Sequence, residues 1–363
     1  MKKILLTFIL TSLCLSVTQA QGTTEHTGAD AILNFLEGAG NNYLNDTETL
    51  IEGYMAPFGE WFGTGLNAGW YNTGKPHQFP GFDVTAGVHF IRSPESAMVF
   101  SPNLIALSPE HDELSTILGL SNSTDIFYTN PATGNMEPIF TSPGGLNWGG
   151  LLVMPYLQGS IGLIKNTEIL FRLAPKVDVD NLSVGFWGLG FKHDIKQWIP
   201  GIKILPFDLS FVAGYSTLKS SLEFGGNNLG NERIQEGNMM HFDVKAFNSN
   251  LVLSKKLSIL TPYIGIGYQY SQAHLALKGQ YYYTSYDNEF PMHSTPIQDP
   301  FDFSFGGVNG LKATIGARLK LFLFTLHVDW SKAKYDVFTV GIGLNSDIGS
   351  KLVGNKIDKV ITE

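Results

Sequence analysis

The sequence predicts an all-β protein, a transmembrane antiparallel β-barrel of about 12 to 14 strands with a short N-terminal helical plug segment. Three observations predict this class. Apolar residues recur at every second position in many segments, which is the period of a strand. Glycine and aromatic residues are abundant while charged residues are scarce, and the chain opens on an export signal. The same period also fits a secreted β-sandwich or a soluble barrel, whose apolar face points inward.

Residues 1–20, MKKILLTFILTSLCLSVTQA, have the pattern of a cleaved secretory signal peptide. Two lysines precede an uncharged run, and a small-residue site at Ala20 would release Gln21 as the new terminus. Cys14, the only cysteine, would leave with the signal. The mature protein is therefore expected to contain no disulfide and no thiolate metal site.

Charge and composition narrow the class of protein further. Removing the two signal lysines from 24 basic residues leaves 22 against 32 acidic ones, so the formal net charge changes from -8 to -10. An acidic chain without a basic run is not suited to bind nucleic acid, and we expect no nucleic-acid partner. After residue 20 no uninterrupted apolar run reaches the roughly twenty residues that a spanning helix needs. Contact with outer-membrane lipid is therefore expected from strands.

Residues 28–56 break the strand period and predict two short amphipathic helices. We assign residues 21–58 to an N-terminal helical segment that either packs on the barrel rim or plugs the lumen. A barrel of about fourteen strands is too wide for its own side chains to fill, so the lumen is either occupied by something such as a plug or is an open channel. The apolar positions recur at i, i+3, i+4 and i+7, and they are Ala29, Ile32, Leu33 and Leu36, then Leu50, Ile51, Tyr54 and Met55.

Residues 59–345 are assigned to the barrel. The less apolar face of the strands is rich in Gly, Ser, Thr and Asn, whereas a solvated outer face would carry more Lys and Glu. The apolar face is therefore expected to meet lipid. Strands are predicted near 61–71, 82–91, 151–163, 167–174, 182–192, 207–215, 239–252, 263–270, 313–321, 325–330 and 337–344. Aromatic residues near strand ends suit interfacial girdles, namely Trp61, Trp70, Tyr71, Trp187, Tyr268, Tyr270 and Trp330.

The segments between the strands predict the two ends of the barrel. The long irregular stretches 93–148 and 278–302 suit external loops, because outer-membrane barrels alternate long external loops with short periplasmic turns. Residues 192–208 are interpreted as a turn, and residues 346–363 as a C-terminal periplasmic tail. Four glycine pairs at spacing two would relieve crowding where backbones or a plug approach closely, and they are Gly63/Gly65, Gly188/Gly190, Gly265/Gly267 and Gly341/Gly343.

The run 313–330, ATIGARLKLFLFTLHVDW, is interpreted as a hairpin of two barrel strands. Its apolar residues occupy odd-numbered positions up to Leu321 and even-numbered positions from Leu326. This change predicts a tight turn without glycine near 321–324. A spanning helix would place a charge in lipid at a cost of about 2.5 to 3.5 kcal/mol. As a hairpin, its four ionisable side chains face the lumen and become the candidates for contact with the plug or a ligand, namely Arg318, Lys320, His327 and Asp329.

Catalytic and cofactor motifs are not recognised in the sequence. The glycine pairs lack the following helix of a nucleotide-binding loop, and the histidines are spread singly without the spacing of metal ligands. We therefore expect no enzyme activity, no metal and no cofactor. A hydrolase built on a barrel remains an alternative, because its catalytic residues can be far apart in sequence.

Two runs carry a family resemblance, YMAPFGEWFGTGLNAGWYNTGKPHQFPGFDVT at 54–85 and GLGFKHDIKQWIPGIKILPFDLSFVAGYSTLK at 188–219. The chain resembles an uncharacterised family of Gram-negative outer-membrane β-barrels, and more remotely the long-chain fatty-acid transporter (FadL/TodX-like) superfamily. That resemblance implies a plugged barrel in the cell outer membrane and passive uptake of a hydrophobic or small nutrient. It transfers no ligand residue. The alternative is a structural or partner-scaffolding barrel without transport.

Overall fold

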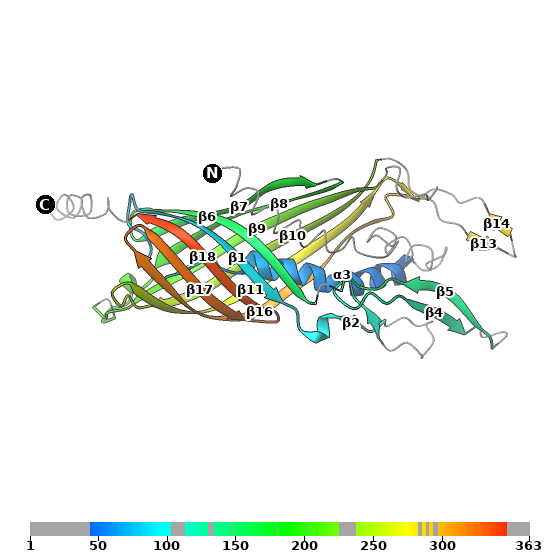
Figure 1. The fold of residues 1–363 in the computed structure, drawn as a ribbon, viewed down its shortest axis with the longest axis horizontal. Coiled ribbons are helices and arrows are strands. Elements are labelled where there is room, and N and C mark those ends of the chain that lie inside the picture. The colour runs from blue at the N-terminus through cyan, green and yellow to red at the C-terminus, as the bar shows by residue number, and fades with distance from the viewer. Residues whose placement is uncertain are drawn as a thin grey trace.

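In a computed structural model of the protein, ten strands from the described part of the chain close into one antiparallel barrel (Figure 1). The structure describes residues 44–102, 113–129, 134–147, 149–179, 181–202, 204–224, 237–281, 285–287, 290–292 and 297–346. The strands follow one another around the wall, and the last one pairs with the first. They are β1 (Phe82–Arg92), β6 (Leu151–Gly162), β7 (Thr167–Val179), β8 (Leu182–Asp194), β9 (Asp208–Phe224), β10 (Asn238–Ser254), β11 (Leu260–Lys278), β16 (Phe301–Leu321), β17 (Phe324–Lys332) and β18 (Asp336–Ser346).

The other elements lie outside the barrel wall, apart from one long helix, α3 (Leu44–Asn67). Four two-stranded ladders form in the segments after β1 and β11. These elements are η3 (Glu95–Ala97), β2 (Val99–Phe100), β3 (Leu114–Ser115), β4 (Thr124–Thr129), β5 (Met136–Ser142), η4 (Lys196–Trp198), β12 (Gln280–Tyr281), β13 (Ser285–Asp287), β14 (Phe290–Met292) and β15 (Ile297–Gln298).

The predicted class is confirmed, but the predicted number of 12 to 14 strands is wrong. Several barrel strands extend well beyond the segments predicted for them, since β11 has 19 residues and β16 has 21. Apart from 61–71, each segment predicted as a strand corresponds to one barrel strand, so the further strands that were expected are not part of the wall among the described residues. Part of the long stretch 93–148 also pairs with itself, as β2 with β3 and β4 with β5, and adds nothing to the wall.

The wall turns its apolar side chains outward. On β17, Phe324, Leu326, Val328 and Trp330 are exposed, and the residues between them are buried. Water would not favour so much exposed apolar surface, whereas lipid accepts it, and pairing between neighbouring strands satisfies backbone groups for which lipid offers no partner. The exterior is therefore that of a membrane-spanning barrel. None of the helices among the described residues is long and apolar enough to cross a membrane.

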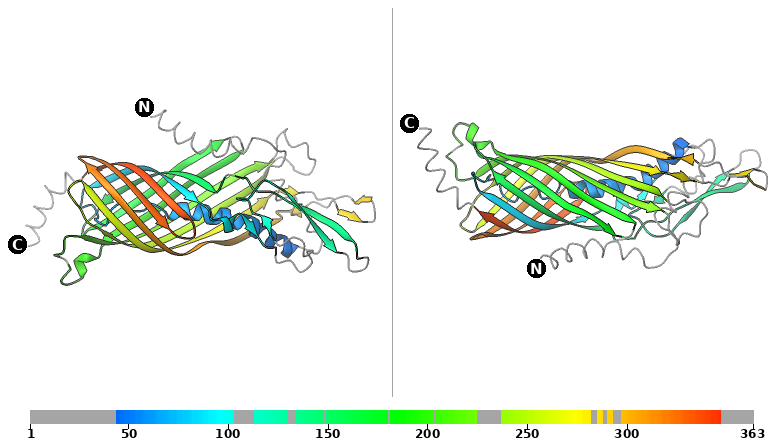
Figure 2. Two further views of the ribbon diagram at one scale, coloured as in Figure 1. Left: turned by 60° about the horizontal axis from the view of Figure 1, so that its bottom comes forward. Right: turned by 90° about the horizontal axis from the view of Figure 1, so that it is seen from above.

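α3 runs inside the barrel, as Figure 2 shows from two further sides. The helix contains 24 residues, which corresponds to about 36 Å of length. It corrects two predictions, because residues 44–67 form one helix and the predicted strand at 61–71 does not exist. Trp61, Trp70 and Tyr71, expected in interfacial girdles, are buried within the lumen.

The alternation of aromatic and glycine residues misled the strand assignment at 61–71. In the helix, Gly59, Gly63 and Gly65 lie against the wall, where a Cβ at Gly59 would be 2.7 Å from Ala273 and one at Gly65 2.5 Å from Met154. Glycine here lets the helix approach the wall closely, rather than marking a strand face.

The two ends of the barrel differ, and we name them the loop end and the turn end. The loop end carries the segments after β1, β9 and β11, and α3 begins there. The turn end carries short connections, such as the two residues between β16 and β17, and both the start of β1 and the described C-terminal end of β18 lie there (Figure 1). Residues 44–81 therefore pass through the barrel from the loop end to the turn end.

Several predictions lie outside the described residues. These are the signal peptide at 1–20, residues 21–43 of the expected helical segment, and the tail beyond Ser346. The region expected as a turn at 192–208 contains the end of β8, η4 and the start of β9.

Candidate functional site

The loop half of α3 sits in an apolar core at the loop end. Leu50, Ile51, Tyr54 and Met55 are all nearly fully buried there, together with residues of the 93–147 region and of β10, β11 and β16. The Tyr54 hydroxyl donates to the carbonyl of Gly144 over 2.9 Å. This half of the helix is held mainly by apolar burial.

Tyr335, in the connection between β17 and β18, fixes the middle of α3. Its hydroxyl is 3.2 Å from the carbonyl of Pro57 and 2.9 Å from Oε2 of Glu60. Burial, and then the neighbouring Glu60 carboxylate, raises the pKa of this phenol, so Tyr335 remains a hydrogen-bond donor. Lys334 also pairs with Glu60, which ties the helix to this connection.

Two cations of the wall hold the C-terminal end of α3. Lys312 on β16 donates to the carbonyl of Asn67 over 2.8 Å, and Arg172 on β7 donates to the carbonyls of Ala68 and Gly69, each over 2.7 Å. The last carbonyls of a helix lack helical partners and carry partial negative charge. Lys312 therefore satisfies the last carbonyl of the buried helix, and Arg172 satisfies the carbonyls of the two residues that follow it.

Arg172 is sandwiched between two aromatic rings. Its guanidinium carbon lies 4.5 Å from the Trp70 ring and 4.6 Å from the Tyr156 ring. Gln158 accepts from the same guanidinium at 3.1 and 2.7 Å. These contacts give the fully buried cation hydrogen bonds and ring faces in place of water.

A seat of glycines receives the Trp70 indole. A Cβ at Gly190 or Gly214 would lie 2.6 Å from the ring, and one at Gly188 would lie 3.1 Å from it. The predicted role of the Gly188/Gly190 pair is confirmed, because the plug does approach the wall closely there.

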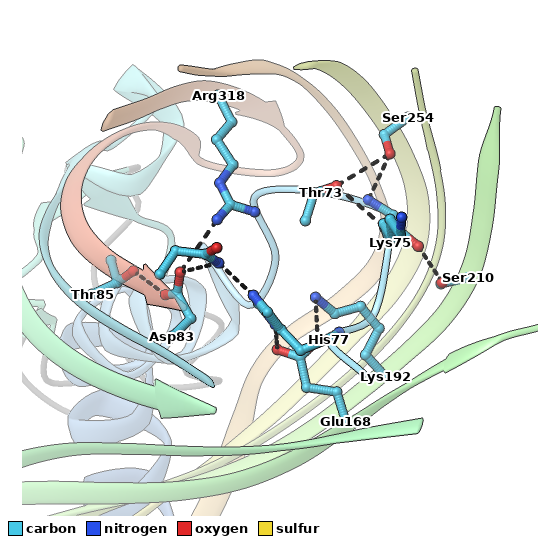
Figure 3. A network of polar contacts seen from close by, with 12 residues as sticks. Thr73, Lys75, His77, Asp83, Thr85, Glu168, Lys192, Ser210, Ser254 and Arg318 are labelled. Atoms are coloured by element: carbon cyan, nitrogen blue, oxygen red, sulfur yellow. Dashed lines mark hydrogen bonds and ion pairs between the residues drawn. The ribbon is translucent and has the colours of Figure 1, made fainter. Parts of the chain in front are cut away.

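The segment after Trp70 is latched to the wall at the turn end by a buried acid (Figure 3). Glu168 on β7 accepts from the backbone N–H of His77 at 3.0 Å, lies 3.1 Å from Nδ1 of the same histidine, and pairs with Nζ of Lys192 on β8 at 3.0 Å. The side chains of Glu168 and Lys192 are only 2% and 3% exposed. Charges this deeply buried require such partners.

Serines of β9 and β10 hold the preceding residues (Figure 3). Ser254 accepts from the backbone N–H of Gly74 at 2.9 Å and lies 3.3 Å from the Thr73 hydroxyl. Ser210 donates to the Gly74 carbonyl. We call Thr73, Gly74 and His77, with Ser210, Ser254, Glu168 and Lys192, the turn-end latch.

A second polar group adjoins the latch. Asp83 on β1 pairs with Arg318 at 3.3 Å and accepts from Thr85 at 2.6 Å. Asn345 on β18 donates to Asp83 over 3.1 Å and also bonds His77 and Lys320. The group therefore connects the end of the plug to the first and last strands of the barrel.

The four sequence-predicted residues all extend into the interior, but they do not form one site. Arg318 and Lys320 lie at the turn end, where their partners are Asp83 and Asn345. His327 and Asp329 lie further along β17. Nε2 of His327 is 3.3 Å from the Tyr156 hydroxyl, and Asp329 accepts from the Tyr263 hydroxyl at 3.0 Å. All these named partners belong to the wall, and a role in ligand or plug contact stays a prediction.

An apolar inner face lines the loop half of β7 to β10. Phe58 and Phe62 of α3 stack edge to face at 4.8 Å, and Phe242 of β10 lies 5.2 Å from Phe58. Several of these inward side chains are only partly buried. We define the apolar inner face as Phe58, Phe62, Ala174, Val184, Leu222, Met240 and Phe242.

The wall is unpaired beside this face. β6 and β7 pair over residues 157–162 and 168–173, whereas residues 151–156 and 174–179 of the same described strands do not pair with each other. In the same register Pro155 would oppose Pro175, and neither proline has an N–H to donate. A bulge after Ala174 also shifts the pairing of β7 with β8. We call this opening of the ladder at the loop end the β6–β7 seam, and Figure 1 shows the two strands diverging there.

Ionisable side chains also gather at the loop end of β11 and β16. His274 and Asp302 lie 2.8 Å apart, and Lys278 pairs with the same aspartate, but all three side chains are partly exposed on a strand surface. Among the described residues no group of three or more His, Cys, Asp and Glu side chains could hold a metal ion.

A family model matches residues 1–346 of the sequence, and its description is a family of unknown function (DUF6588). The chain belongs to this family. The resemblance to an uncharacterised family is thereby confirmed. Among curated proteins, none matches the chain.

Solved membrane barrels are similar to this DUF6588 chain at low identity. The translocator domain of the autotransporter NalP from Neisseria meningitidis is 11% identical, with 81% of this chain and 98% of that chain covered and a TM-score of 0.34. The outer membrane protease OmpT from Escherichia coli is 7% identical (73% and 97% covered, TM-score 0.29). The toluene transporter TodX from Pseudomonas putida is 10% identical (74% and 90% covered, TM-score 0.25). Likenesses at this level carry no information about activity.

Sequence reasoning missed the residues that hold the plug. Arg172, Glu168 and Lys192 are charged residues on the inward face of predicted strands, and Lys312 directly precedes the one at 313–321, so that position was a usable signal. Two prolines inside neighbouring predicted strands were also a signal, because proline in a central strand removes a ladder hydrogen bond.

Proposed function

We propose that this barrel lies in the outer membrane and lets a small hydrophobic molecule enter passively from the outer leaflet through the β6–β7 seam. The observation that carries the proposal is that β6 and β7 do not pair with each other near the loop end, beside the apolar inner face. With the loop end outside the cell, the seam opens to the outer leaflet, where hydrophobic compounds partition. The proposal gives the protein no catalytic step.

Entry and exit would use different parts of the interior. The inner face offers apolar contact close to the seam, which favours a hydrophobic molecule over water-soluble nutrients. Beyond it, residues 68–81 occupy the interior down to the turn end, and the turn-end latch holds them. Release of a molecule to the periplasm would therefore require that segment to move.

A structural barrel without transport is the second candidate. The observation that favours it is the set of buried polar contacts between the plug and the wall, made by Arg172 with Ala68 and Gly69 and by Glu168 with His77, which resists motion. The two functions differ in one measurable respect, because only the first requires a compound to cross the membrane through this protein.

The direct test is uptake by cells. Cells that express the protein and cells that lack it would be given radiolabelled naphthalene and oleate in parallel. We expect faster accumulation of at least one compound with the protein present. Equal accumulation of both compounds in the two strains would contradict transport and favour the structural alternative.

A cross-link tests the seam itself. Val153→Cys and Val177→Cys would oppose each other if the ladder continued, and bismaleimides of increasing length can join them. We expect the joined protein to lose the uptake conferred by wild type. The matched control joins Leu326→Cys to Ile342→Cys, which already pair on β17 and β18 and face outward. Uptake that survives the seam cross-link, or falls equally in the control, would exclude entry through the seam.

A substitution that fills the space at the apolar inner face tests the same route without a cross-linking reagent. Ala174→Trp would occupy the apolar inner face, and we expect it to reduce uptake. Ala86→Trp, on the outward side of β1, is the control and should leave uptake unchanged. A heat-modifiable band on a gel would verify that both variants form the barrel.

A further inference from the structure

The pairing register places a row of small outward side chains between two rows of large ones on the wall opposite the seam. Pro262, Ala317 and Val328 are neighbours across β11, β16 and β17. On one side of them runs a row of residues that are 47 to 58% exposed, namely Ile264, Ile315, Trp330 and Phe338. On the other side runs Leu260, Leu319, Leu326 and Ile342.

The small row is the floor of a groove in the lipid-facing wall. The groove has a volume of about 750 Å³ and an almost wholly apolar lining. The groove crosses the strands, because residues that pair on neighbouring strands lie on a line perpendicular to the strand direction. The small side chains of the floor do not fill the space between the two rows of large ones. Apolar groups from the surrounding membrane must therefore occupy that space.

Basic residues lie at the turn end of the groove. Lys255 is part of its lining, Lys256 follows in the same exposed turn, and Phe207 lines the groove from the start of β9. Nζ of Lys196 lies 5.1 Å from the centre of the Phe207 ring. Lysine can bury its aliphatic stem on apolar surface while its ammonium group stays at the water interface.

We propose that this groove binds a phospholipid with an acidic head group from the periplasmic leaflet. Its acyl chains lie on the floor formed by Pro262, Ala317 and Val328, and its phosphate meets Lys255 and Lys256. Charge complementarity selects this occupant, because an apolar groove that ends at Lys255, with the exposed Lys256 next to it in the chain, matches an acyl chain that ends at an anion. The assignment of the leaflet rests on the orientation given under the proposed function, which places the turn end in the periplasm.

The groove is distinct from the seam in place and in role. It lies on the outer surface over β9 to β18, and its floor belongs to strands that pair without interruption at these residues. A bound lipid there would add contacts across several strands of that wall. The groove therefore has no part in the route proposed for uptake.

The test is lipid retention by the purified full-length protein. The barrel would be extracted in detergent, exposed to equal amounts of phosphatidylglycerol and phosphatidylethanolamine, and analysed by native mass spectrometry. We expect one retained lipid with preference for phosphatidylglycerol. Ala317→Trp should abolish retention by filling the floor, whereas Ala313→Trp, outward on the same strand but outside the groove lining, should keep it.

Charge variants test the head-group contact. Lys255→Gln and Lys256→Gln should each weaken retention of phosphatidylglycerol roughly fivefold, as expected for one lysine near an anionic surface. Lys165→Gln, in the turn between β6 and β7 at the same end, is the control and should have no effect. Heat-modifiable migration would confirm that every variant is folded.

Three outcomes would overturn the proposal. Equal retention by the Ala317 and Ala313 variants would mean that lipid binds elsewhere. Retention without head-group preference would mean ordinary lipid contact with the wall. A dimer that Ala317→Trp disrupts would mean that a second copy of the chain covers the groove. These results are obtained without an uptake assay, so they can fail or succeed independently of the transport proposal.

Discussion

The two halves of the threaded segment 44–81 are held by different physics. The loop half is fixed by apolar side chains such as Ile51 and Met55, which are buried at 0% and 3% exposure in the loop-end core. The turn half is fixed by directional contacts, including those of Thr73, Gly74 and His77 with the wall. The two halves share one continuous chain within one barrel.

Because of this difference, the loop half mainly stabilises the plug, whereas the turn half mainly sets its position in the barrel. Apolar burial is non-directional and tolerates small shifts, so the loop half stabilises the plug without fixing its register strictly. Buried polar groups are costly when they lose a partner, so the turn half is stable only in one arrangement. The latch therefore decides where the plug sits, and it would respond sharply to a single lost partner.

Loss of Glu168 should have the largest effect. Glu168→Ala leaves the buried Lys192 ammonium without its carboxylate, and we expect a loss of about 3–5 kcal/mol in the free energy of unfolding. The measurement is urea-induced unfolding in lipid vesicles, followed by the heat-modifiable band. A cysteine at Asn72 should also become reactive to maleimide. Asp178→Asn removes the partner of an exposed lysine and should change neither quantity. An unchanged Glu168 variant would show that the latch contributes little.

Loss of an apolar contact in the loop half should have a smaller and less specific effect. Ile51→Ala removes a fully buried side chain from the core, and we expect a loss of about 3 kcal/mol in unfolding free energy. The cysteine at Asn72 should stay unreactive, because the latch remains intact. Glu52→Ala, on the exposed side of the same helical turn, should have little effect. Exposure of position 72 in the Ile51 variant would contradict the separation of the two halves.

Crowding of the Trp70 seat should cost less again. Gly214→Ala places a methyl group 2.6 Å from the indole, and we expect a loss of about 1–3 kcal/mol as the ring shifts. Gly159→Ala on β6 meets nothing within 4 Å and is the matched control. Thermal unfolding in detergent would compare the two. Equal stability of the variants would mean that Trp70 is not seated tightly.

The direction of the thread can be checked without any change in stability. Glu48 and Glu52 are exposed near the start of α3 at the loop end, and Ile164 is 72% exposed at the turn end. On intact cells an impermeant maleimide should label Glu48→Cys and spare Ile164→Cys until the outer membrane is permeabilised. The reverse pattern would invert the orientation of the barrel and of both proposals.

Local patterns predicted the wall well and the interior poorly. The hairpin at 313–330 forms as expected, with β16 ending at Leu321 and β17 starting at Phe324 across a turn without glycine. Alternation sufficed there because each strand exposes one face to lipid. The partners of its charges could not be predicted, since Arg318 meets Asp83, which is 235 positions away in sequence. Such pairs depend on strand number and closure, and ten strands bring together other residues than fourteen would.

The continuation of α3 to Asn67 was hidden for a related reason. Gly59, Gly63 and Gly65 resemble a strand face when read alone, and only the nearby wall explains them as points of close approach. The seam was missed because one proline in a strand marks only a local defect. Two prolines matter when the register sets them opposite each other.

The threaded segment also constrains how the protein is assembled. Residues 44–81 enter the barrel at the loop end and leave it at the turn end directly into β1, which closes the barrel against β18. The segment 44–81 is thus threaded through a barrel whose wall includes β1, the strand that directly follows this segment in the chain. The barrel must either close around this segment while the strands insert, or the segment must be drawn through a finished barrel. In the first case the buried parts of the segment 44–81 would guide the strands as the barrel closes. Deleting them would then slow membrane insertion more than it lowers the stability of the finished barrel.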